Sequence, residues 1–144
     1  MKNILSIVII AIIFLCACGK SFDTTDIITG FKDDDLNVSD EKKMTHEDFG
    51  AAPMKADDAR IFVVSGDNHA RVFKFKNEGD LKQTKKYYDE LGEESAILYS
   101  HTHAKDKFLI QMNGEVDDKT FNKYKSSMDK TFNKYKSSMD KTLK

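Results

Sequence analysis

Two pairs of short apolar segments, each pair joined by a turn, place the strongest constraint on how this chain can fold. The four segments are rich in apolar and β-branched residues and cover 61–64, 71–76, 96–103 and 107–113. The short polar links within each pair favour antiparallel hairpins. Phe73 and Phe75 fall on one face of their strand and Lys74 and Lys76 on the other, which predicts a sheet with one face on the core and one in water.

Helical patterns flank and separate these hairpins. Apolar residues recur at helical spacing within 21–36 and again within 80–91, after which Gly92 is expected to end the helix. A third helix follows the second hairpin. The order helix, hairpin, helix, hairpin, helix predicts an α+β class, with a single small domain over 22–130 whose antiparallel four-stranded sheet packs on helices.

A polar stretch over 37–58 separates the first helix from the first hairpin. It shows neither helical nor strand periodicity, and Pro53 interrupts it. We therefore expect a long irregular loop, apart from one helical turn that Thr45 begins and Gly50 ends.

The C-terminal segment contains the same eleven residues twice, TFNKYKSSMDK over 120–130 and again over 131–141. Eleven residues are three helical turns with about 20° left over, so the apolar face of the first copy nearly continues into the second. We expect one copy to complete the domain and to suffice for folding. The second copy would then extend the last helix as a tail over 131–144 with an exposed apolar stripe.

The N-terminal residues are typical of a bacterial export signal. A basic start precedes an apolar run of 14 residues, which is shorter than the roughly 20 residues that span a membrane and fits a signal peptide over 1–17. The run ends in a leucine, a cysteine, Ala17 and then Cys18, and this order resembles the bacterial lipobox. In a lipobox, a peptidase would cut between Ala17 and Cys18, and Cys18 would carry the lipid. The sequence therefore predicts a lipidated N-terminus over 18–21 and a protein held at the extracellular face of the cell membrane.

Composition limits the chemistry of the mature chain. Cys16 leaves with the signal peptide and Cys18 takes the lipid, so no thiol remains for a disulfide or a cysteine-held metal. Once Lys2 is removed, 22 basic and 24 acidic residues remain. The mature chain therefore lacks the surplus of basic residues that is typical of proteins that bind nucleic acid. The sequence has no glycine-rich phosphate loop, nucleophile motif or HExxH pattern, so we expect no cofactor and no enzymatic activity.

Several short motifs follow one another in order over 18–130. They are Phe22-Asp23 with Ile27-Ile28 and Phe31-Lys32, Met44-Thr45 with Asp48-Phe49-Gly50 and Ala52-Pro53, the run 87–92, and the run 111–114. This ordered set resembles a family of small Gram-positive lipoproteins that are often labelled stress proteins. The resemblance implies the membrane address and the small fold, and it implies no catalytic residues. The chain departs from the family at 100–103, where aromatic or apolar residues are expected.

His101 and His103 are the first candidates for chemistry. Residues two apart on a strand point to the same face, so both imidazoles could meet one metal ion. His69 in the first hairpin turn or His46 in the long loop would supply a third ligand, with Asp106 as a carboxylate option. The alternative interpretation is a pair of partly exposed histidines at the end of a strand.

Three functions remain open at this point. The leading one is a non-enzymatic binding or interaction module of the cell envelope, anchored to the membrane and meeting a protein or envelope partner. It rests on the lipid anchor, the lack of catalytic motifs and the tyrosine-rich faces. The second is a metal-binding lipoprotein. The third places the function in the discarded signal peptide, because residues 11–17 resemble short apolar pheromone peptides released from such signals.

The lipobox generates a direct prediction about Cys18. Replacement by alanine (Cys18→Ala) removes the thiol that takes the lipid, so metabolic labelling of the protein with a fatty acid should be lost. Labelling that is unchanged in the variant would contradict the lipid anchor.

Overall fold

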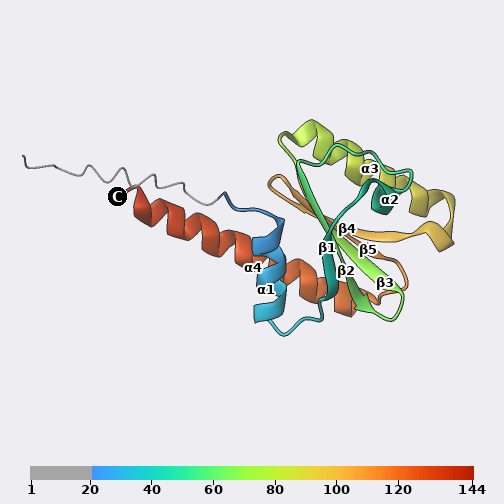
Figure 1. Ribbon diagram of the computed structural model, residues 1–144, viewed down its shortest axis with the longest axis horizontal. Coiled ribbons are helices and arrows are strands. Elements are labelled where there is room, and N and C mark those ends of the chain that lie inside the picture. Colours follow the sequence, from blue (N-terminus) through green and yellow to red (C-terminus); the bar gives the residue numbers. More distant parts are fainter. Residues whose placement is uncertain (1–20) are drawn as a thin grey trace, which may run out of the picture.

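A computed structural model describes residues 21–144, so the predicted signal peptide, Ala17 and Cys18 lie outside the described residues. The described chain has an α+β fold in which helices cover a five-stranded antiparallel sheet (Figure 1). Its elements are α1 (Thr24–Asp33), β1 (Ser39–Lys43), α2 (His46–Phe49), β2 (Asp58–Ser65), β3 (Asn68–Lys74), α3 (Glu78–Glu94), the 3-10 turn η1 (Ala96–Leu98), β4 (Ser100–Lys105), β5 (Phe108–Asn113) and α4 (Asp118–Thr142).

Both predicted hairpins are present, and they join through their second strands. The strand order is β1-β2-β3-β5-β4, and every neighbouring pair is antiparallel. Val72 of β3 lies opposite Ile110 of β5 at the junction of the hairpins. This pairing puts β3 and β5 in the interior of the sheet and leaves β1 and β4 at its edges.

The prediction of four strands was one short, because β1 lies inside the stretch that we expected to be irregular. Its residues are polar throughout and carry no alternation that could reveal a strand. Lys42 pairs with Ile61 of β2, while a bulge interrupts the ladder and Asp40 adopts a positive φ of 49°. Charged side chains and a bulge are usual on an edge strand, where they discourage pairing with other chains. The helical turn between Thr45 and Gly50 is confirmed as α2.

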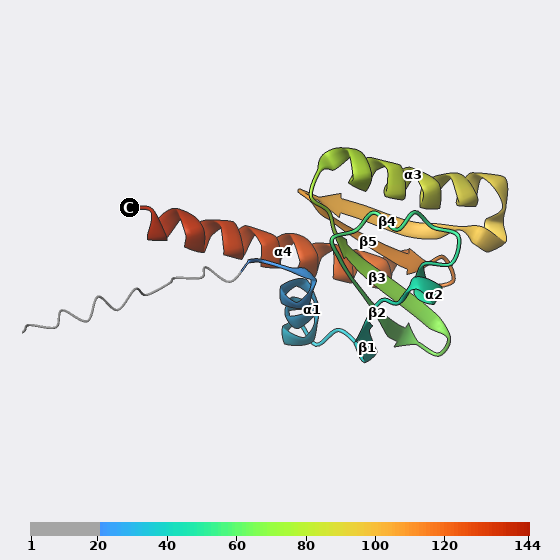
Figure 2. The same cartoon turned by 45° about the horizontal axis from the view of Figure 1, so that its top comes forward.

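The sheet has two covered faces, so the prediction of one wet face was wrong. Phe73 and Phe75 point toward α3, whereas Val72, on the supposed wet face, is fully buried under α1 and α4. The two layers of helices are visible on opposite sides of the sheet in Figure 2. The Lys74 side chain extends to the edge of this apolar layer, where its ammonium group donates a hydrogen bond to the Phe22 carbonyl at 2.7 Å.

Two element ends also differ from the sequence prediction. Helix α3 is capped by the side chain of Asn77 and continues past Gly92 to Glu94. Residues 96–98 form a 3-10 turn rather than the start of a strand, and the pairing of β4 with β5 begins only at Ser100, opposite Asn113.

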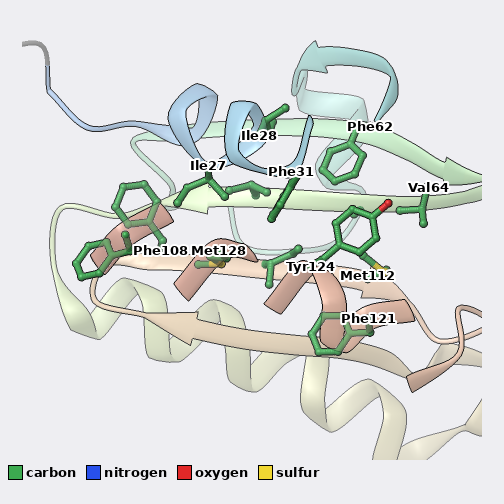
Figure 3. Close-up of a cluster of buried hydrophobic side chains, with 14 of the residues drawn as sticks. Ile27, Ile28, Phe31, Phe62, Val64, Phe108, Met112, Phe121, Tyr124 and Met128 are labelled. Carbon is green, nitrogen blue, oxygen red and sulfur yellow. The ribbon is translucent and has the colours of Figure 1, made fainter. Parts of the chain in front are cut away.

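The larger core forms between α1, α4 and one face of the sheet (Figure 3). Phe31 of α1 packs edge-on against Tyr124 of α4 with ring centroids 5.2 Å apart, and the Tyr124 hydroxyl donates to the Asn37 carbonyl at 2.7 Å. Burial raises the pKa of the Tyr124 phenol. Lys130 of α4 binds Asp34 at the end of α1, and this hydrogen bond holds the pKa of the Asp34 carboxyl below its usual value.

The two copies of the repeat meet different surroundings on α4. Phe121, Tyr124 and Met128 of the first copy are buried. Phe132 in the second copy is buried as well, so the expected exposed stripe is wrong at this residue, whereas Met139 is 47% exposed. The core therefore continues one turn into the second copy before the helix leaves the body of the protein.

The same contrast allows a matched stability prediction. Met128 and Met139 occupy the same position in identical sequences, yet Met128 is fully buried. Met128→Ala should lower the free energy of unfolding by about 2–5 kcal/mol, because it leaves a cavity, and Met139→Ala by less than about 0.5 kcal/mol. Urea denaturation of both variants measures the difference. Equal losses would mean that the helix beyond Tyr135 is buried too.

Candidate functional site

The two candidate metal ligands lie on β4 and point to the same face, as expected. His101 is opposite Met112 and His103 opposite Ile110, and both Met112 and Ile110 belong to the core under α4. Each imidazole already has a partner in the protein. The Nε2 atom of His101 lies 2.6 Å from the Val116 carbonyl, while the Nε2 atom of His103 lies 2.7 Å from Asp129.

The structure does not bring a third metal ligand to these histidines. His69 belongs to β3, with Nδ1 2.8 Å from the Asp67 carbonyl, and His46 belongs to α2. No group of three or more histidine, cysteine or carboxylate side chains is placed to hold a metal ion within residues 21–144. Metal binding by His101 and His103 therefore stays a prediction with two ligands, both engaged in holding β4 to its neighbours.

The most distinctive surface of the described chain lies at η1. Ile97, Leu98 and Tyr99 are consecutive, and their exposed fractions are 94%, 49% and 47%. We call these three residues the η1 surface. They border a groove of about 700 Å³. The rest of its lining comes from η1 itself, the β2–β3 connection, the start of β4 and the end of β5 with the residues after it, namely Ala96, Asp67, Asn68, Ser100, Asn113, Gly114 and Glu115.

Close backbone approaches hold the η1 surface in place. A Cβ atom on Gly114 would lie 2.4 Å from the Tyr99 carbonyl oxygen, and one on Gly92 would lie 3.0 Å from the Tyr99 ring. The Gly114 amide also donates to that carbonyl at 3.1 Å. His101 packs edge-on against the Tyr99 ring at 5.1 Å. The apolar side chains are thus presented on a fixed backbone, which lowers the ordering cost of binding.

Polar contacts beneath the η1 surface fix β4 to its neighbours. Buried Gln111 of β5 accepts a hydrogen bond from Arg71 of β3 at 2.9 Å and donates one to Ser100 of β4 at 2.8 Å. Thr102 of β4 donates to Asp89 of α3 at 2.5 Å, and Lys85 binds the same carboxylate. These contacts join β3, β4, β5 and α3 to one another, and Ser100 among them lines the groove. Their arrangement supports a rigid binding surface.

Sequence reasoning missed this surface because it assigned 96–99 to a strand. The available signal was the unbroken run of Ile97, Leu98 and Tyr99, since a half-buried strand alternates and a run of three does not. The predicted lipidation site lies outside the described residues, so the structure places nothing there.

No protein-family model, curated protein or solved structure matches this chain. Within residues 21–144, none of the helices is both long enough and apolar enough to cross a membrane.

The glycine contacts generate a prediction. Gly114→Ala would force a methyl group against the backbone of Tyr99, so the free energy of unfolding should fall by about 1–3 kcal/mol. Gly79→Ala is the matched control, because its Cβ would meet only the Asn77 side chain, at 3.2 Å, and alanine favours the helix. Chemical denaturation compares the two variants. Equal stability of both would show that Tyr99 is not held as described.

Proposed function

We propose that this chain is a lipoprotein, anchored through Cys18 at the extracellular face of the cell membrane, that acts as a non-enzymatic binding module of the cell envelope. Its partner docks on the η1 surface. The observation that carries the proposal is the exposure of three consecutive apolar side chains beside a groove, on a backbone fixed by Gly92 and Gly114.

The position of the η1 surface supports this function. Ser21 accepts a hydrogen bond from Lys74, at the end of β3, whereas Asn68, at the start of β3, lines the groove. The seven residues of β3 span about 20 Å at 3.3 Å per residue. Ser21, where the described chain starts, and the η1 surface therefore lie at opposite ends of the sheet (Figures 1 and 2). A protein anchored next to Ser21 would present the groove away from the membrane.

The chemistry of the surface favours a protein partner. Large aliphatic and aromatic side chains supply most of the energy of protein interfaces when they enter a pocket on the partner. The exposed carboxylates of Asp67 and Glu115 border the apolar side chains and would select a partner with basic residues around its pocket. The tyrosine-rich faces that suggested binding from the sequence contribute mainly to the cores, and Tyr99 alone belongs to the η1 surface.

A crosslinking experiment in intact cells tests the proposal. The wild-type protein should capture a defined protein partner, and the double variant Ile97→Ser/Leu98→Ser should lose at least about nine-tenths of it, since removing two apolar anchors costs more than 1.4 kcal/mol. Met54→Ser is the matched control, because Met54 is a solitary exposed methionine away from the groove. Equal capture by all three proteins would contradict the η1 surface as the binding site.

A further inference from the structure

The last part of α4 leaves the body of the protein and has no role in either core. All residues from Lys136 to Lys144 are exposed, including Met139 at 47% and Leu143 at 83%. Tyr135, Met139 and Leu143 are four residues apart, so they form one stripe along the helix. This stripe continues the buried face of the same helix beyond the edge of the body.

This projecting segment lies at the same end of the molecule as the start of the described chain. The Phe22 and Tyr135 rings stack with centroids 4.3 Å apart and planes at 19°. Both views show the start of the described chain on the side of the sheet from which the end of α4 projects (Figures 1 and 2). Ser21 is three positions after Cys18, so the two residues are about 11 Å apart at most. If Cys18 carries lipid, as the proposed function requires, the membrane surface is within reach of the end of α4.

The charge of the segment complements an anionic surface. Four lysines, Lys134, Lys136, Lys141 and Lys144, stand against the single carboxylate side chain of Asp140 over residues 134–144. In the described part of the chain, none of the four forms an ion pair. Lys130, by contrast, is occupied by Asp34. Unpaired lysines around an apolar stripe are typical of helices that lie at the surface of anionic membranes.

We infer that the last two turns of α4 contact the anionic lipid surface to which Cys18 is anchored, with Met139 and Leu143 among the headgroups and the lysines at the phosphates. This inference rests on the lipid anchor of the proposed function and adds a second membrane contact to it. A second copy of this helix is a poorer occupant, because side-by-side pairing would bring eight lysines together.

A fluorescent probe tests the contact directly. The full-length protein is expressed in its host with Met139→Cys, and the mature lipidated product is purified, since its only free thiol is then the new one. Mass spectrometry first confirms lipid on Cys18. The thiol is labelled with an environment-sensitive dye, and the protein is reconstituted into vesicles of phosphatidylglycerol mixed equally with phosphatidylcholine. Spin-labelled headgroups should quench the dye at least twofold more strongly than in vesicles of phosphatidylcholine alone.

Two matched controls use the duplication. Ser126→Cys places the dye on an exposed residue of the first copy and should show little quenching. Lys136→Gln/Lys141→Gln/Lys144→Gln should abolish the quenching at position 139. Lys119→Gln/Lys123→Gln/Lys125→Gln removes the same charge from the start of α4 and should leave the quenching unchanged. Raising the salt concentration should weaken the contact, because exposed charges are screened.

Each contrary outcome has a distinct meaning. An unquenched dye on a protein with confirmed lipid would overturn the membrane contact and leave the proposed function standing. A mature protein without lipid would overturn the anchor and this inference together. Equal quenching in both kinds of vesicle would refute the role of the lysines. A dye response that rises with protein concentration in detergent alone would show that the end of α4 contacts a second copy of the chain and not the membrane.

Discussion

The burial of β5 on both faces is the constraint on which the rest of the structure depends. Phe108 and Ile110 point toward α1 and α4, Leu109 points toward α3, and all three are at most 3% exposed. Each such side chain contributes about 1.5–3 kcal/mol when buried. A strand with apolar residues on both faces needs helices packed on both faces. Helices α1 and α4 cover one face of the sheet, and α3 covers the other. Those layers decide where every candidate surface lies.

The duplicated segment shows how surroundings assign different roles to one sequence. The first copy fills the core because the sheet and α1 lie opposite it, with Phe121 stacked on His101 at 4.8 Å. The second copy begins against α1, where a Cβ on Gly30 would clash with Thr131. The residues after Tyr135 are exposed and belong to neither core. What remains is a basic, partly apolar helix end beside the predicted anchor. The opposite end of the sheet carries the η1 surface.

Local patterns in the sequence predicted the hairpins, the α+β class and the turn at α2, because alternation and capping residues act over a few positions. They failed for β1, whose polar residues become a strand only through pairing with β2. They failed also for the second face of the sheet, since Lys74 and Lys76, which share that face with Val72 in the sequence pattern, made it look polar. The position of the η1 surface depends on where β5 ends, and the position of the His101 ring depends on its contact with the Val116 carbonyl, 15 residues later in the chain. Neither could be predicted from the local sequence.

The body of the protein, and not the sequence of the repeat, decides which residues of α4 are core. Amide hydrogen exchange of the mature protein in detergent, without vesicles, tests this most directly, because identical segments have the same intrinsic exchange rates. Amides over 126–130 should exchange only through global unfolding and those over 137–141 through local fraying, at least about a thousandfold faster. Similar protection of the two segments would contradict the claim.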